Sequence, residues 1–248
     1  MIGDLQAAAR ALAAKAPDLK ASSGKALEAE VLFEFALAAT RHGQVAARTH
    51  RGSRLRRGQR FRLRGGPGRL WDPQAGGAGP SYFAVAIDDA EFELHNSLEF
   101  VGSSQVEHEM DVSAVWRPEA DAARYSADRT LSGAPLIGIE LKEYGVGKTV
   151  DKNLVRAFFA CIVDFTPAWP ISVVTFGGGG GFRRNYVAAP RSKDQFWFLT
   201  TGWISAPAKA FGAAYDIRVL DHLETLKFKV AVTVMATRLR DLAHHPLL

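Results

Sequence analysis

Two segments near the N-terminus repeat apolar residues at the spacing of an α-helix. The first covers residues 2–16, where the apolar positions stand among alanines. The second covers about residues 25–42, with Ser22 or Ser23 as its N-cap and Gly43 just beyond its C-terminal end. The spacing predicts that the buried face of this second helix consists of Leu27, Val31, Leu32, Phe35, Ala36 and Ala39.

Downstream, short runs rich in β-branched and aromatic residues predict strands, and longer amphipathic runs between them predict helices. The strand at residues 171–176 follows a helix, which is the order of a crossover connection and predicts parallel pairing in the sheet. The polar residues 117–133 predict a short helix, about 121–129, outside the core. The other predicted strands are residues 81–87, 92–100 (the weakest pattern), 106–115, 136–144, 195–204 and a short segment at 218–220, and the other predicted helices are residues 151–165, 206–215 and 230–243.

This alternation of strands and helices predicts an α/β fold in which helices flank a mixed central β-sheet. An Arg- and Gly-rich insertion at residues 44–80 interrupts it, and within this insertion residues 60–64 alternate arginines with apolar residues. We predict a basic hairpin there; a disordered arm that folds on nucleic acid is the alternative. No repeat or linker divides the chain, so residues 1–248 are expected to form a single domain, with residues 190–248 as a C-terminal extension.

Two of the predicted strands carry ionisable residues near one end. Because side chains alternate across a strand, Glu109 and Asp111 should share one face of the first strand, and Glu140 and Lys142 one face of the second. If the two strands are neighbours, three carboxylates and one amine converge. Mg²⁺ prefers carboxylate oxygens, and a nearby lysine can position a water molecule. The pattern is suited to metal-assisted hydrolysis of a phosphodiester; two ordinary strands with a solvated charged face are the alternative.

This order of residues resembles the PD-(D/E)XK nuclease superfamily, the restriction-endonuclease-like fold, over about residues 24–175. The resemblance rests on Asp111 in one strand, on Glu140 and Lys142 in the next, and on Glu28 in the preceding helix. Met110 precedes Asp111, where many members of the superfamily have a proline. A restriction-endonuclease-like core with a basic insertion is therefore the expected architecture.

The resemblance also implies a set of roles. Asp111 and Glu140, with the main-chain carbonyl of Leu141, would hold one or two Mg²⁺ or Mn²⁺ ions. Lys142 would orient or activate the attacking water and oppose the charge that develops on the phosphate. The helix glutamate that completes the site would be Glu28, aided by Glu109, with Glu30 and Glu34 as alternatives.

Charge is distributed unevenly along the chain. The formal net charge is +5, yet the stretch from Arg48 to Arg69, called the basic segment below, contains nine arginines and no acidic residue, so the rest of the chain carries −4. Such a block is typical of a surface that binds nucleic acid; a solvated arm, or one that pairs with acidic patches of the same protein, is the alternative. The candidate phosphate contacts are Arg54, Arg56, Arg57, Arg60, Arg62, Arg64, Lys148 and Lys152.

Other chemistries find little support in the sequence. A single cysteine, Cys161, excludes an internal disulfide and a cysteine-based zinc site, and its apolar surroundings favour a core thiol. Residues 145–149 resemble the end of a phosphate-binding loop, but Lys142 stands where that motif requires glycine. No metalloprotease or serine-hydrolase motif occurs. With no apolar run of membrane-spanning length and no signal peptide, we expect a cytoplasmic protein that does not contact membranes.

The expected function is therefore that of a metal-dependent endonuclease that hydrolyses phosphodiester bonds, most readily in DNA, with restriction or phage defence as the role that the resemblance suggests. A non-catalytic nucleic-acid-binding protein on the same scaffold is the first alternative, and an oligomeric structural protein with a solvated acidic sheet edge is the second. The sequence leaves open DNA or RNA, the sequence specificity, a homodimer or higher homo-oligomer, and any activating ligand or partner.

Overall fold

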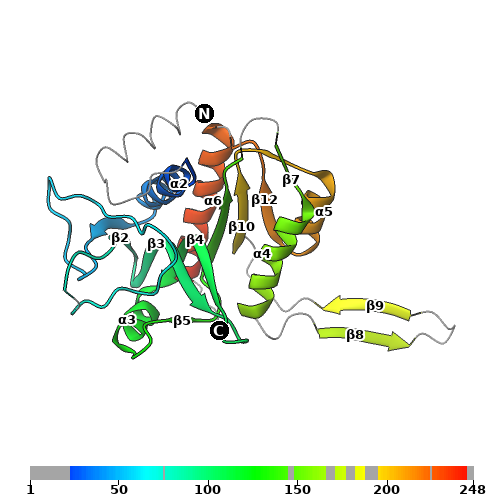
Figure 1. The fold of residues 1–248 in the computed structure, drawn as a ribbon, viewed down its shortest axis with the longest axis horizontal. Coiled ribbons are helices and arrows are strands. Elements are labelled where there is room, and N and C mark those ends of the chain that lie inside the picture. The colour runs from blue at the N-terminus through cyan, green and yellow to red at the C-terminus, as the bar shows by residue number, and fades with distance from the viewer. Residues whose placement is uncertain are drawn as a thin grey trace.

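The structure, a computed structural model, describes residues 23–74, 76–144, 148–165, 171–176, 182–187, 195–223 and 225–244. Within these residues a mixed β-sheet lies between two layers of helices (Figure 1), which confirms the predicted α/β fold class. The helix predicted at residues 2–16 and the five glycines at residues 177–181 lie outside the described residues. In the part of the chain that is described, no helix is both long and apolar enough to cross a membrane.

The central sheet changes from antiparallel to parallel pairing at its middle. Its main path, in spatial order, is β1 (Gln44–Arg48), β2 (Tyr82–Ile87), β3 (Ala90–Val101), β4 (Glu107–Trp116), β6 (Ile137–Lys142), β10 (Phe196–Thr200) and β12 (Ile217–Leu220). The pairs from β1 to β6 are antiparallel, and the pairs β6–β10 and β10–β12 are parallel. A short strand, β5 (Leu131–Ser132), pairs with β3 in parallel.

Helices cover both faces of this sheet. Helices α2 (Ser23–Ala39) and α6 (Thr225–His244) lie side by side on one face, and α4 (Lys152–Phe165) and α5 (Ala206–Ala214) lie on the other (Figure 1). Helix α3 (Arg117–Tyr125) packs beside β3 and β4. It begins earlier than the sequence predicts, since Pro118 stands at a helix start, where a missing N–H costs nothing.

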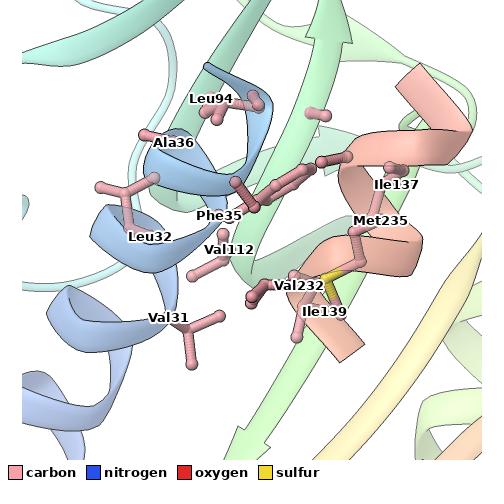
Figure 2. Packing of buried hydrophobic residues seen from close by; sticks show 14 of the residues in the cluster. Val31, Leu32, Phe35, Ala36, Leu94, Val112, Ile137, Ile139, Val232 and Met235 are labelled. Carbon is pink, nitrogen blue, oxygen red and sulfur yellow. The ribbon is translucent and has the colours of Figure 1, made fainter. Parts of the chain in front are cut away.

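Each face has its own hydrophobic core. Figure 2 shows the first, in which Phe35 of α2 and Met235 of α6 meet over Val112, Ile137 and Ile139 of the sheet. All six residues predicted for the buried face of the second helix are buried there. The second core cluster lies under α4 and α5 and is rich in phenylalanine, including Phe158, Phe196 and Phe198. Helix α2, which begins at Ser23, is thereby fixed against the strands that carry the candidate site.

Two predictions about strands are wrong. Residues 171–176 form β8 (Ile171–Phe176), which pairs antiparallel with β9 (Phe182–Val187) in a separate two-stranded sheet that extends from the body in Figure 1. The predicted parallel crossover exists, but it runs from β6 through α4 to β10. The apolar, β-branched pattern of residues 171–176 predicted a strand correctly but not its partner, because a following segment could offer an antiparallel ladder nearer in sequence. Residues 195–204 form two strands, β10 and β11 (Trp203–Ile204), and β11 pairs with β7 (Thr149–Val150).

The basic hairpin is also absent from the structure. The described residues between β1 and β2 form isolated bridges only, Arg48 with Arg54 and Gly68 with Leu98. The reason lies in what satisfies the main chain. The main-chain N–H and carbonyl of Arg64 both bond to the side chain of Asn96, at 3.0 and 3.2 Å, so a side chain takes the place of a partner strand.

The apolar residues of the insertion pack separately. The Phe61 ring stacks on Phe83 of β2 and meets Phe33 of α2 edge-on, with ring centroids 4.7 and 5.0 Å away, and Leu63 is buried in the first core cluster. The insertion is thus fixed to the body at several points, although it has no regular strand of its own.

Gly43 is required where α2 turns into β1. A Cβ atom at this position would lie 2.1 Å from the carbonyl oxygen of Ala86 in β2, far inside van der Waals contact. The glycine therefore allows β1 to approach β2 closely, and this contact fixes the end of α2 relative to the sheet.

Candidate functional site

Strands β4 and β6 separate at the position of the predicted carboxylates. Their ladder ends with the pair Val112 and Ile139, and on the same register the next pair would be Asp111 and Glu140. There, the carboxylate of Asp111 accepts a hydrogen bond from the main-chain N–H of Leu141, with 2.6 Å between Oδ2 and N. The Asp111 side chain takes the place of a main-chain acceptor, so its position is tied to the backbone of the Glu-x-Lys strand.

The side-chain alternation of β3 and β4 is interrupted at this same level of the sheet. Phe92 of β3 packs in the first core cluster, but Phe100, also at an even position, packs in the second. In β4, Met110 packs in the second cluster and Val112 in the first. In a regular strand, residues an even number apart share a face. The interruption lies at Ser97 of β3, whose φ is 47°, and next to Asp111 of β4.

Glu28 of α2 reaches the interruption from the helix side. It is 7% exposed, and its Oε2 accepts a hydrogen bond from Oγ of Ser97 at 2.8 Å and a longer one from Asn96 at 3.4 Å. Lys25, one turn earlier, forms an ion pair with Glu28 at 2.7 Å and donates to Oγ of Ser97 at 2.6 Å. Of the three helix glutamates considered from the sequence, Glu28 is the buried one; Glu30 is exposed and Glu34 half-buried.

The carboxylates of this cluster perturb one another. Burial raises the pKa of Asp111 to about 8, and the charges of Glu140 and Glu28 add to this, against the lowering effect of the Leu141 N–H and of Lys142. Burial also raises the pKa of Glu140, in part offset by Lys142. The mutual influence of Glu28, Asp111 and Glu140 means that the helix and the two strands bring these side chains into one electrostatic environment.

Lys142 is paired with Glu140. Its Nζ lies 2.5 Å from Oε1 of Glu140. Burial lowers the pKa of Lys142, but the carboxylates of Glu140, Asp111 and Glu109 outweigh it and raise the pKa above its ordinary value. Lys142 is therefore an ammonium group at neutral pH, which can donate hydrogen bonds and oppose negative charge but cannot accept a proton.

The donor set at this point suits a hard divalent cation. Mg²⁺ is bound in proteins by one or two carboxylates together with water and substrate oxygens, and Asp111, Glu140 and the carbonyl of Leu141 supply such oxygens at one place. Among the described residues, no group of three or more His, Cys, Asp and Glu side chains is close enough to hold a metal ion by itself. A cation held by Asp111 and Glu140 would therefore have to keep several of its own waters.

The basic segment borders this cluster. Asn96, which bonds to the main chain of Arg64, also donates to Glu28, so one side chain connects the segment with the helix glutamate. The predicted phosphate contacts that are exposed are Arg54, Arg56, Arg57, Arg60, Arg62, Lys148 and Lys152.

Arg64 differs from the other predicted contacts. It is 9% exposed, its Nη1 donates to the carbonyl of Arg69 at 2.7 Å, and burial lowers its pKa to about 10. Its guanidinium is used to hold the turn at residues 64–69, so we remove Arg64 from the set of surface contacts.

Sequence reasoning missed the polar residues that connect these parts. Asn96 and Ser97 lie in β3, the strand predicted with the weakest pattern, and Lys25 lies at the start of α2. Apolar and polar residues alternate in the first part of β3, and three consecutive polar residues, 95–97, break this alternation. Asparagine is also depleted in strands. This break was the available signal for an interrupted strand, although nothing in the sequence indicated that Glu28 was a partner of Asn96 and Ser97.

Comparisons with known proteins add little. No family model matches the chain, and no curated protein matches it. One solved structure, "Crystal Structure of Protein of Unknown Function AF1548", is similar with a TM-score of 0.34 and 17% identity over 59% of this chain. The match spans 58% of that protein's length, and a likeness this weak supports no statement about fold or function.

Proposed function

We propose that the protein is a Mg²⁺-dependent nuclease that hydrolyses phosphodiester bonds in DNA. The observation that carries the proposal is the convergence of Asp111 with Glu140 and Lys142, about thirty residues later in sequence, where β4 and β6 separate. The exposed arginines of the basic segment support a polyanionic substrate.

Each residue has a defined task in this proposal. Asp111, Glu140 and the Leu141 carbonyl would hold the cation, which would act as a Lewis acid on the phosphate and on a water molecule. Glu28, held by Ser97 and Lys25, limits how far the cluster can rearrange. In the reaction the oxygen of a water molecule bonds to phosphorus, the bond from phosphorus to one ester oxygen breaks, and the leaving oxygen takes up a proton that balances the one lost by the water.

Lys142 has a more restricted role than the sequence alone suggested. Because its raised pKa keeps it protonated, it donates hydrogen bonds to the phosphate or to the attacking water and opposes the negative charge of the transition state. As long as Glu140 stays paired with it, Lys142 cannot act as the base that removes a proton from water. Since its partner Glu140 is a candidate cation ligand, substrate and cation would draw the two side chains apart.

The substrate approaches across the basic segment. Five of the exposed arginines of this segment are predicted phosphate contacts, and Lys148 and Lys152, which follow the Glu-x-Lys strand, add further positive charge. Binding through such residues releases counterions, so affinity should fall steeply as salt increases.

Cleavage of plasmid and single-stranded DNA in Mg²⁺ or Mn²⁺, and in EDTA, tests the proposal. Asp111→Asn and Lys142→Met should each abolish cutting while leaving the fold intact, and Glu91→Gln, which removes an exposed carboxylate of β3 paired with Arg117, should cut as the parent does. Tight, salt-sensitive DNA binding without cutting would favour the non-catalytic scaffold, and neither binding nor cutting would reject both.

A further inference from the structure

The chain bends at Thr201 and Gly202, directly after β10, and this bend contacts the residues that follow Lys142 at the same end of the sheet. Thr200 of β10 is the register partner of Lys142, and the N–H of Thr201 donates to the carbonyl of Lys142 at 3.3 Å. Tyr144, two residues after Lys142, donates from its N–H to Oγ1 of Thr201 at 3.0 Å. A Cβ atom at Gly202 would lie 2.8 Å from Cβ of Tyr144, so the two segments are in close contact.

Trp203 follows this bend and is exposed. Its side chain is 54% exposed, whereas the other described tryptophans are buried or half-buried. Its main chain is nevertheless fixed, because it pairs with Thr149 in the β11–β7 ladder and its N–H donates to the carbonyl of Lys148 at 3.2 Å. A large aromatic side chain that is exposed to solvent on a fixed backbone can stack against a flat ligand.

His222 supports the indole from behind. Its ring meets that of Trp203 edge-on, with centroids 3.8 Å apart. The main-chain N–H of His222 donates to the carbonyl of Gly202 at 3.0 Å. Its φ is 48°, a left-handed conformation that costs a non-glycine residue free energy. Its Nε2 is buried and has no hydrogen-bond partner among the described residues. The local backbone is strained, and this strained conformation places the imidazole against the tryptophan.

We propose that Trp203, backed by His222, is a stacking site for an unpaired nucleobase next to the candidate catalytic centre, so that the preferred substrate carries single-stranded DNA near the phosphate that is cut. This inference rests on the proposed function. Trp203 is the third residue after Thr200, the register partner of Lys142, so it lies at most about 10 Å along the chain from that level, within a few nucleotides of the candidate centre. Lys148, exposed and bonded through its main chain to Trp203, supplies positive charge for the backbone beside that base.

The chemistry favours an unpaired base over a duplex. In a duplex the faces of the bases are covered by their neighbours and only the edges are open in the grooves. A single indole at the rim of a site can contact a base face only where the strand is unpaired, and such stacking is tolerant of sequence. The site therefore selects for strand structure and leaves base identity unread.

The test compares single-stranded and duplex binding in EDTA, where no cutting occurs. Fluorescence anisotropy of a dye-labelled 12-mer and of a hairpin duplex is measured at one salt concentration for the parent, Trp203→Ala, Trp203→Phe and Tyr125→Ala. Tyr125, 75% exposed on α3, is the matched control. Trp203→Ala should weaken single-strand binding roughly five- to hundredfold, Trp203→Phe should weaken it less, and duplex affinity and the Tyr125→Ala variant should stay within about twofold of the parent.

Equal losses for single strand and duplex, no loss in either, or an equal effect of Tyr125→Ala would overturn the stacking site. If thermal melting shows that Trp203→Ala is unfolded, the same binding measurements are made on Trp203→Leu and Trp203→Phe. Both variants keep an apolar side chain, but only phenylalanine can stack. The two proposals can fail separately. A parent that cuts no DNA in Mg²⁺ but loses single-strand binding on Trp203→Ala retains the stacking site and rejects the nuclease; a parent that cuts but is insensitive to Trp203→Ala does the reverse.

Discussion

Replacing Arg124 with methionine should unfold the protein at a much lower denaturant concentration. Arg124 on α3 is 8% exposed and forms a bidentate ion pair with Glu93 of β3, which is 0% exposed; its Nη1 lies 2.9 Å from Oε1, and its Nη2 bonds to Oε2. Nε2 of His95 lies 2.8 Å from the same carboxylate. Without Arg124, the Glu93 carboxylate stays buried with His95 as its remaining partner.

Two independent routes give the size of this loss. Burial raises the pKa of Glu93, but the hydrogen bonds and charges of His95 and Arg124 outweigh it and lower the pKa from 4.5 to about 2. At about 1.4 kcal/mol for each pKa unit, this corresponds to roughly 3 kcal/mol of stabilisation at neutral pH, which His95 and Arg124 supply together. Removal of one partner of a buried ion pair typically costs about 3–5 kcal/mol. The expected loss at pH 7 is therefore about 3–5 kcal/mol.

Urea unfolding followed by far-ultraviolet circular dichroism measures the change in the free energy of unfolding. Arg117→Met is the matched control, since Arg117 lies on the same helix and pairs with Glu91 in solvent, where an ion pair contributes at most about 1 kcal/mol. The pH dependence has a defined sign. A lowered carboxyl pKa stabilises the fold above about pH 4.5, and this stabilisation is lost as the pH falls towards 2. The difference in the free energy of unfolding between the parent and Arg124→Met should therefore become smaller as the pH falls. A loss below 1 kcal/mol at pH 7, or one equal to that of Arg117→Met, would refute the reasoning.

Three further predictions follow from the fold and the site. Replacing three exposed arginines of the basic segment with glutamine should reduce the slope of log affinity for DNA against log salt by roughly 2–3, at about 0.9 for each phosphate contact; filter binding measures this for Arg54, Arg56 and Arg57 together. Asp111→Asn should raise the melting temperature in EDTA at pH 8 and leave it nearly unchanged at pH 4, because a carboxyl pKa raised by burial to about 8 makes the folded parent lose stability as the pH rises from about 4 to 8; a gap that does not grow with pH would contradict this. Gly43→Ala should cost about 1–3 kcal/mol through its clash with the Ala86 carbonyl, whereas Gly66→Ala, with nothing within 4 Å of the added Cβ, should be close to neutral in the same urea assay.

The parts of the fold that local patterns encode were predicted well. The buried face of α2 follows from apolar residues at helical spacing, and β2 and β4 follow from short apolar runs between turn signals. Pairing between distant strands is not encoded locally. The sequence at residues 171–176 indicates a strand, but its partner β9 was chosen by proximity along the chain, and nothing in the sequence of β10 marked it as the parallel neighbour of β6.

The candidate site shows the same division. The local pattern predicts strands for Asp111, Glu140 and Lys142, whereas the expectation that these strands are neighbours came from the resemblance to the PD-(D/E)XK superfamily. The interruption at Ser97 had one signal in the sequence, the three consecutive polar residues 95–97, but the alternation rule for regular strands does not give the φ of 47° at Ser97 or the partners of its side chain. The hairpin predicted for residues 60–64 fails for a related reason: the side chain of Asn96, thirty-two residues away, satisfies the main chain of Arg64.

The claim that Asp111 and Glu140 form a divalent-cation centre is tested most directly by calorimetric titration of Mn²⁺ into the metal-free protein at pH 8. We predict one or two ions bound per chain in the parent and in Glu91→Gln, and loss of this binding in Asp111→Asn and in Glu140→Gln. A parent that binds no Mn²⁺ at millimolar concentration, or an Asp111→Asn variant that binds it as the parent does, would contradict the account.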